Sequence, residues 1–239
     1  MRIAMWSGPR NLSTTLMRSF AARSDTAAID EPFYAAYLDI TGLRHPMTDE
    51  ILARHEADPR KVIAHLTGPA PDGKANFYQK HMTHHMVDAI PMDWLGRIEQ
   101  HVMLIRHPAR VVASYSRKME LLSAEVMGFP QQERLWKQIT DAKGTAPTVV
   151  DADNILADPD GVLRRLCAAI GLDWDSAMLS WPPGPRPEDG AWAPHWYDAV
   201  WRSTGFGAPP GPLPELSGEA AAIAQAALPG YERLLAARV

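Results

Sequence analysis

Apolar residues along the 239-residue chain gather into short runs, each followed by a polar turn. Four of these runs are rich in β-branched, aromatic or long aliphatic side chains, and we predict that they form buried strands. They are residues 3–6, 76–79, 102–105 and 148–151. Residues 26–29 form a weaker fifth candidate.

Helical periodicity of apolar residues fills much of the chain between these runs. It predicts helices over residues 13–23, 48–55, 84–90, 109–125, 131–143 and 160–170. Alternating strands and helices favour an α/β fold, in which a parallel sheet has helices on both faces and forms three layers. Ligands of such sheets bind beyond the carboxyl ends of the strands, where these polar turns lie.

The region from residue 180 to 214 differs from the rest, because it is crowded with proline, glycine and tryptophan. Tryptophan side chains need packing partners, so we interpret this region as an ordered segment that caps a site around a helical turn at 193–202. A proline-rich surface loop is the alternative. An alanine-rich helix, 217–238, interrupted at Pro229-Gly230, completes what we expect to be one domain spanning residues 1–239.

The composition of the chain argues against some classes of protein and some binding partners. The chain is 46% hydrophobic and 22% charged with a net charge of −4, so we expect no nucleic-acid partner. No apolar stretch approaches the roughly 18 residues that span a bilayer, and the first residues lack a signal-peptide pattern, so we expect a cytoplasmic protein without a membrane partner. The single cysteine, Cys167, lies in an apolar helical pattern and is predicted to be a buried structural thiol.

The loop after the first strand, S-G-P-R-N-L-S-T-T at residues 7–15, predicts an anion site. A helix N-terminus presents unpaired N–H groups, Arg10 adds a permanent cation, and Ser13, Thr14 and Thr15 add hydroxyls. Helix capping by Ser13 would explain only one of these hydroxyls. The loop lacks the lysine of a Walker motif, which disfavours ATP hydrolysis or kinase activity.

Residues 9–18, P-R-N-L-S-T-T-L-M-R, resemble the P-R-S-G-T-T-L-M-R loop of sulfotransferases that use 3′-phosphoadenosine 5′-phosphosulfate (PAPS). The tyrosylprotein and bacterial branches are the most similar. The resemblance implies a P-loop-type sulfotransferase fold and PAPS as co-substrate, with no metal. The residues it assigns to the 5′-phosphosulfate are Arg10, Asn11, Ser13, Thr14 and Thr15. Where the family has Ser-Gly, this chain has the longer Asn11-Leu12-Ser13, and losing the glycine changes how closely the backbone approaches the anion.

A second resemblance lies at residues 106–118, R-H-P-A-R-V-V-A-S-Y-S-R-K. It is similar to the family's 3′-phosphate signature, R-x-P-(x)5-S, and implies that Arg106 and Ser114 hold the 3′-phosphate. We interpret Arg110 and Lys118 as exposed residues of an ordinary amphipathic helix. If the resemblance holds, Arg10 and Arg106 must meet at one edge of the sheet.

Two further stretches are similar to the family. Residues 149–172 look like its Y-E-D-L-x-x-D-P…L-C-x-x-x-G-L region, with Asp151 in place of the aromatic residue, and we expect this region to serve the fold. Residues 184–192 faintly resemble the R-K-G-x-x-G-x-W loop that closes over the adenosine diphosphate moiety. There Arg186 would supply the cation and Gly190 the tight turn.

Sulfuryl transfer needs a base for the acceptor's proton, and Glu31 is the best candidate. It follows the strand candidate 26–29 on the side of the two anion loops, and the tyrosylprotein branch has its glutamate at a similar distance. Pro32 predicts an extended backbone at Glu31. The alternative is an exposed acid beside Asp30.

Residues 77–85, F-Y-Q-K-H-M-T-H-H, supply the other candidates. The family places a lysine near the bridging oxygen, which makes Lys80 the predicted electrostatic helper. His81 is the runner-up base, since cytosolic sulfotransferases use a histidine in a similar stretch. A metal site is disfavoured because no acidic or cysteine partner has ligand spacing, and His84 and His85 are predicted to be solvated or capping residues.

The sequence therefore predicts a sulfotransferase that moves a sulfuryl group from PAPS to a hydroxyl or amine of a small-molecule acceptor. The tryptophans and Phe33-Tyr34 suggest an apolar or aromatic acceptor. Two alternatives stay open at this point. One is a phosphotransferase or phosphatase of P-loop ancestry, and the other is a non-catalytic nucleotide-binding module.

Overall fold

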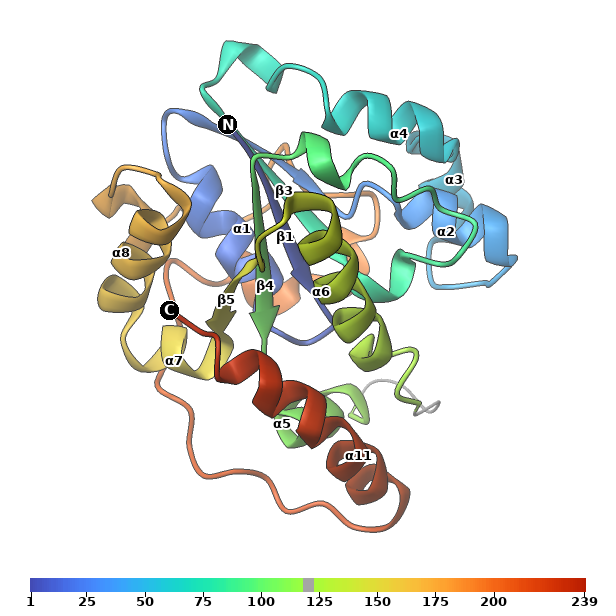
Figure 1. Cartoon of the computed structure of the whole chain (residues 1–239), viewed down its shortest axis with the longest axis vertical. Coiled ribbons are helices and arrows are strands. Elements are labelled where there is room, and N and C mark those ends of the chain that lie inside the picture. Colours follow the sequence, from blue (N-terminus) through green and yellow to red (C-terminus); the bar gives the residue numbers. More distant parts are fainter. Residues whose placement is uncertain (118–122) are drawn as a thin grey trace.

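Five parallel strands form the centre of the molecule in the computed structural model, which describes residues 1–117 and 123–239 (Figure 1). The strands are β1 (Arg2–Ser7), β2 (Thr26–Asp30), β3 (Asn76–Met82), β4 (Gln100–Ile105) and β5 (Thr148–Asp151). Their order across the sheet is β2-β3-β1-β4-β5. All five predicted strands are present, and the predicted parallel α/β sheet is confirmed.

Helices cover both faces of this sheet (Figure 1). The longer ones are α1 (Ser13–Ala21), α2 (Tyr34–Thr41), α3 (Thr48–Arg54), α4 (Pro59–Leu66), α5 (Pro108–Tyr115), α6 (Phe129–Lys143), α7 (Ala152–Ala157), α8 (Pro159–Ile170) and α11 (Gly218–Leu235). In the described part of the chain, no helix is both long enough and apolar enough to cross a membrane.

Three helix predictions need correction. In place of a helix at 84–90 there is a single 3-10 turn, η2 (Thr83–His85), because Met86 and Ile90 reach the core without helical backbone. The predicted helix 109–125 ends at residue 115, and residues 118–122, Lys118 among them, lie outside the described residues. The last helix, α11, runs on through Pro229 rather than breaking there, since Leu234 beyond the proline is buried in the core.

Strand alternation divides the core between the two faces of the sheet. On one face, Met5 of β1 packs with side chains of α1 and α8, including Cys167, which is buried as predicted. On the other face, Trp6 packs with side chains of α4, α6 and α11. The central strand β1 is thus buried on both faces of the sheet. Its packing holds in place the start of the loop that follows it.

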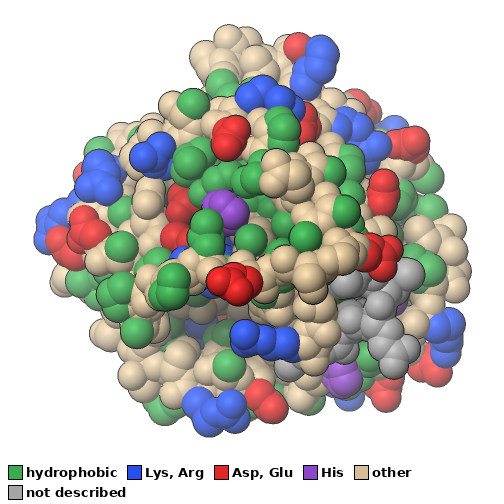
Figure 2. All heavy atoms as spheres, turned by 90° about the horizontal axis from the view of Figure 1, so that it is seen from below, with side chains coloured by type: hydrophobic (Ala, Val, Ile, Leu, Met, Phe, Trp, Pro, Cys, Tyr) green, Lys and Arg blue, Asp and Glu red, His purple; other side chains and the backbone are tan. Residues whose placement is uncertain are grey.

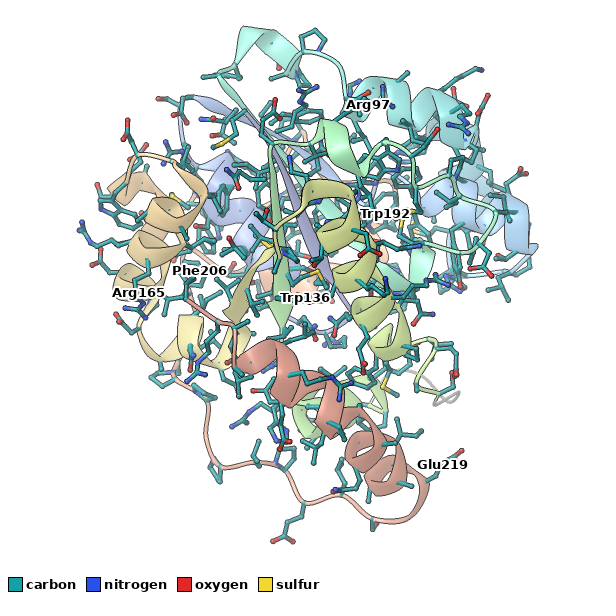
Figure 3. All side chains as sticks on the ribbon, viewed as in Figure 1. Arg97, Trp136, Arg165, Trp192, Phe206 and Glu219 are labelled. Atoms are coloured by element: carbon teal, nitrogen blue, oxygen red, sulfur yellow. The ribbon has the colours of Figure 1, made fainter. Side chains whose placement is uncertain are left out.

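The predicted capping segment is ordered and crosses the molecule. It contains two short helices, α9 (Ala193–Trp196) and α10 (Asp198–Trp201), where the sequence predicted a helical turn. Figure 3 labels two of its aromatic residues, Trp192 on the side of α2 and Phe206 on the side of α8. Trp192 packs with residues of α2 and α3, whereas Phe206 packs against the core beside α1 and α8. The segment therefore contacts both sides of the sheet's carboxyl edge.

Candidate active site

A cavity of about 320 Å³ lies beyond the carboxyl ends of the strands. In Figure 1 this is the end towards which the strand arrows point, and Figure 2 looks onto that face, where hydrophobic side chains gather around a central histidine. Every predicted site residue except His81 and Arg186 lines the cavity. Those that do are Arg10, Asn11, Ser13, Thr14, Thr15, Glu31, Lys80, Arg106 and Ser114.

The loop between β1 and α1 has the backbone shape of an anion cradle. Arg10 and Leu12 both have left-handed backbone, with φ of 64° and 70°. Alternation of left- and right-handed residues turns successive N–H groups towards a common centre, and α1 begins at Ser13 with no side-chain cap on its N–H groups. The chain thus keeps the left-handed turn at Leu12 without glycine, at a steric cost of roughly 1 kcal/mol.

The two predicted arginines meet at one edge of the cavity. The Nη1 of Arg106 donates to the carbonyl oxygen of Arg10 at 2.8 Å, and the Nε of Arg10 donates to the Oγ of Ser114 at 2.9 Å. Burial lowers the pKa of Arg10, and the neighbouring cations Arg106 and Arg117 lower it further. Among the described residues Arg10 forms no ion pair, whereas Arg106 and Arg110 share one carboxylate, that of Asp153, so positive charge exceeds negative charge at this edge.

These features fit phosphate or sulfate groups. The hydroxyl groups, the uncapped helix start and the paired arginines are all donors, as phosphate and sulfate oxygens require. The Asn11 side chain donates from Nδ2 to the Leu104 carbonyl at 3.3 Å, while its buried Oδ1 has no partner among the described residues. Arg106 is held from its other side by Asp153, whose Oδ1 lies 3.5 Å from Nε.

Glu31 and Lys80 form an ion pair on the other side of the cavity. Lys80 Nζ donates to Glu31 Oε1 at 2.6 Å and to Asp30 Oδ1 at 2.7 Å. Lys80 extends from β3, and Glu31 directly follows β2, the neighbouring strand. Both side chains therefore reach the carboxyl edge of the sheet, where the sequence placed them.

The backbone at Glu31 is left-handed, with φ of 37°, so the extended conformation predicted from Pro32 is wrong. The Glu31 N–H donates to the Lys80 carbonyl at 2.9 Å, which continues the β2–β3 ladder by one bond and holds this strained turn. Burial raises the pKa of the Glu31 carboxyl to about 7, with Asp30 adding to the rise and Lys80 opposing it. A carboxylate with this pKa is suited to accept a proton near neutral pH.

His81 does not reach the cavity, which corrects its candidacy as a base. Side chains of adjacent strand residues point to opposite faces, and His81 lies on the face away from Lys80. Its ring stacks on Trp6 with centroids 4.3 Å apart and is 1% exposed. Burial lowers the pKa of His81 to about 3, so the ring is neutral.

His84 and His85 are not the solvated or capping residues that the sequence suggested. Both line the cavity, and His85 is buried, stacked between Tyr34 at 4.6 Å and Tyr37 at 4.9 Å. Burial lowers the pKa of His84 to about 3 and that of His85 well below its usual range. The wall beside Glu31 is therefore made of aromatic and neutral imidazole rings.

Two basic residues also differ from expectation. Arg186 does not line the cavity, because the Asp189 carboxylate turns the local backbone and the Arg186 side chain faces Glu188, with Nε 3.7 Å from Oε1. Arg110 is not an exposed surface residue, since its Nε donates to Asp153 Oδ2 at 2.5 Å and its side chain is 14% exposed.

Sequence reasoning missed several residues of this cavity. His45, Tyr115 and Tyr197 line it, and none of them was a predicted site residue. Tyr115 directly follows Ser114, the serine of the second motif, and Tyr197 lies in the tryptophan-rich segment. The motif and the composition therefore indicated the segments that contain these two tyrosines, but not the tyrosines themselves. For His45, in the loop before α3, no sequence signal was available.

Comparison with known proteins identifies the family and the fold. The model of the family described as "Sulfotransferase domain" matches residues 1–238, and the chain belongs to that family. The sulfotransferase domain from the curacin biosynthetic pathway shares the fold, with a TM-score of 0.55 at 16% identity over 94% of this chain and 96% of that one. The sulfotransferase domain of the Synechococcus PCC 7002 olefin synthase gives 0.50 at 17% identity, over 95% and 94%.

Two Arabidopsis thaliana proteins are similar in sequence. "Branched-chain-amino-acid aminotransferase-like protein 2" is 38% identical over 209 residues, which are 87% of this chain and 36% of that protein. "Branched-chain-amino-acid aminotransferase-like protein 1" is 38% identical over 207 residues, 87% of this chain and 37% of that protein. The chain therefore spans about a third of the length of these curated relatives.

Proposed function

We propose that this chain is a PAPS-dependent sulfotransferase that transfers a sulfuryl group to a hydroxyl or amine of a small-molecule acceptor. The observation that carries the proposal is the meeting of two arginine-and-hydroxyl groups, distant in sequence, in the cavity that also holds the Glu31–Lys80 pair. The family membership supports the reaction class.

The cradle after β1 is proposed to bind the 5′-phosphosulfate, through the side chains of Arg10, Asn11, Ser13, Thr14 and Thr15 and the N–H groups at the start of α1. Arg106 and Ser114 are proposed to bind the 3′-phosphate. The bond from Arg106 to the Arg10 carbonyl couples the two groups, because it fixes the backbone of the first while the arginine remains at the second. PAPS, when bound, supplies the sulfuryl group and a phosphate leaving group.

Glu31 is the proposed base. Its ionised carboxylate accepts the proton of the acceptor's hydroxyl or amine, and its raised pKa makes it a stronger base than an ordinary glutamate. Lys80 brings a fixed positive charge to the place where negative charge grows during transfer. The neutral rings of Tyr34, His84 and His85 favour an uncharged, apolar or aromatic acceptor on this side of the cavity.

Binding of 3′-phosphoadenosine 5′-phosphate (PAP) tests the nucleotide assignment. We expect PAP at 100 times its dissociation constant to stabilise the fold by about 2.7 kcal/mol, while ATP stabilises it far less. Arg106→Ala removes a charge-assisted bond worth about 1.5–3 kcal/mol, so PAP affinity should fall roughly 10- to 150-fold. Arg44→Ala is the matched control, because Arg44 is an exposed arginine outside the cavity.

Activity is then measured by mass spectrometry as sulfated product formed from PAPS and a panel of phenols, alcohols and amines. Stabilisation by ATP but not by PAP contradicts the proposal and favours a phosphotransferase. PAP binding without any sulfated product favours a binding module.

A further inference from the structure

The capping segment contributes one buried hydroxyl, that of Tyr197, to the ion pair beside the cavity. Its oxygen donates to Asp30 Oδ2 at 2.5 Å and accepts from Lys80 Nζ at 3.0 Å and from Trp192 Nε1 at 3.1 Å. A phenol has one proton to donate and two lone pairs, so this oxygen uses its full capacity. Tyr197 is 5% exposed, and the network therefore has little access to water.

The same hydroxyl completes the coordination of Lys80. An ammonium group has three N–H donors, and here they go to Asp30, Glu31 and Tyr197. Nζ also lies 5.5 Å from the centre of the Tyr197 ring. With every proton of Lys80 assigned, the direction of the ammonium is fixed by two carboxylates from the sheet edge and one phenol from the capping segment.

Asp30 competes with Glu31 for the charge of Lys80. Its Oδ1 accepts from Lys80, and its Oδ2 is satisfied by the Tyr197 hydroxyl, with the Gly190 N–H at 3.5 Å from the same atom. Both of these Oδ2 partners come from the capping segment. As long as Tyr197 and Gly190 satisfy Asp30 Oδ2, Asp30 takes only one N–H of Lys80. Another N–H of Lys80 is then available to Glu31.

We infer that Tyr197 is a positioning residue, which sets how Lys80 is shared between Asp30 and Glu31 and so makes the capping segment a required part of the active site. This inference rests on the proposed function, since it assigns the effect to Glu31 as base and Lys80 as electrostatic helper. Tyr197 acts through these two side chains.

Removing the hydroxyl and removing the Asp30 charge have opposite consequences. In Tyr197→Phe, Asp30 Oδ2 loses its shorter bond and keeps only the Gly190 N–H, so Asp30 draws Lys80 away from Glu31 and the base becomes harder to ionise. In Asp30→Asn, the competing charge is gone and Lys80 turns fully to Glu31, so the base becomes easier to ionise. A role confined to folding would lower activity in both variants without moving their pH profiles in opposite directions.

The experiment measures kcat, KM for PAPS and the pH dependence of kcat/KM in the full chain, together with PAP affinity. For Tyr197→Phe we expect kcat to fall about 10-fold with PAP affinity within about two-fold, and the acid limb to move up by about half a pH unit or more. For Asp30→Asn we expect the acid limb to move down.

Two controls separate this role from structural ones. Tyr231→Phe deletes a partly buried phenol hydroxyl, which is bonded to Asp151 outside the cavity. Glu188→Gln weakens a different anchor of the capping segment, the ion pair with Arg18. Both are expected to retain the wild-type acid limb and a kcat within about two-fold.

The inference is overturned if the acid limb stays in place in both Tyr197→Phe and Asp30→Asn, or if it shifts in the same direction in both. It is also overturned if Glu188→Gln loses as much kcat as Tyr197→Phe. If Tyr197→Phe does not fold, the pH profile of Asp30→Asn alone tests the inference. An acid limb that stays in place or moves up in Asp30→Asn refutes the inference. Failure of the proposed function is distinguishable, since the wild-type chain would then bind no PAP or form no sulfated product.

Discussion

The raised pKa of Glu31 predicts an unusual pH dependence for a glutamate base. The carboxyl is buried beside Asp30, and together these raise its pKa to about 7 although Lys80 pulls it down. A base must be ionised to accept a proton, so kcat/KM should rise with pH through this value and level off above it. Glu31→Gln removes the base while keeping the size of the side chain.

The magnitude follows from the ionised fraction. With a pKa of about 7, roughly nine-tenths of Glu31 is ionised at pH 8 and roughly one-tenth at pH 6, so kcat/KM should fall about 10-fold over that interval. A glutamate with the ordinary value, about 4.3, would stay ionised across the interval and give almost no change. Loss of general-base catalysis in Glu31→Gln should lower kcat by roughly 10²- to 10⁴-fold.

The assay is sulfated-product formation at saturating PAPS between pH 5.5 and 8.5, with PAP affinity measured at both ends to confirm that nucleotide binding persists. His81→Phe serves as the matched variant, because His81 faces the opposite side of β3 and should leave the acid limb in place. A limb that disappears in His81→Phe but persists in Glu31→Gln would refute the assignment, as would a flat wild-type profile.

Two further predictions concern the supports of the site. Gly8→Ala should destabilise the fold by about 1–3 kcal/mol and weaken PAP binding, because a Cβ there would lie 2.5 Å from the Met127 carbonyl oxygen. Urea unfolding measures this loss of stability. The control is Gly211→Ala, since a Cβ at Gly211 would have no atom within 4 Å. Arg18→Ala should cost about 3–5 kcal/mol, because it leaves the largely buried Asp189 without an ion pair and Glu188 with only the longer contact to Arg186. Arg44→Ala, which breaks an exposed pair, should leave the urea midpoint unchanged, and an equal loss in both arginine variants would contradict the second prediction.

The sequence by itself determined the sheet and the place of the cavity. Short apolar runs followed by polar turns define buried parallel strands, and parallel strands bring their carboxyl ends to one edge. Arg10, Glu31 and Arg106 each follow a strand, and Lys80 lies near the end of one, so their meeting follows from topology without knowledge of any side-chain contact.

Only the tertiary structure decided which neighbouring residues face the cavity. The apolar pattern placed the end of the third strand at residue 79, but β3 continues to Met82, and this longer strand sends Lys80 to the cavity and His81 to the opposite core. Where a strand ends depends on pairing with its neighbours, which a single stretch of sequence does not record.

The contacts of the capping segment were likewise beyond local patterns. Tyr197 meets Asp30 across 167 positions of the chain, and Arg18 meets Asp189 across 171. Local periodicity reflects burial and backbone preference within a few residues, whereas these bonds depend on how the segment folds back over the sheet edge. The sequence thus specified the elements and their order, and long-range packing specified which side chains share a proton, a charge or a cavity.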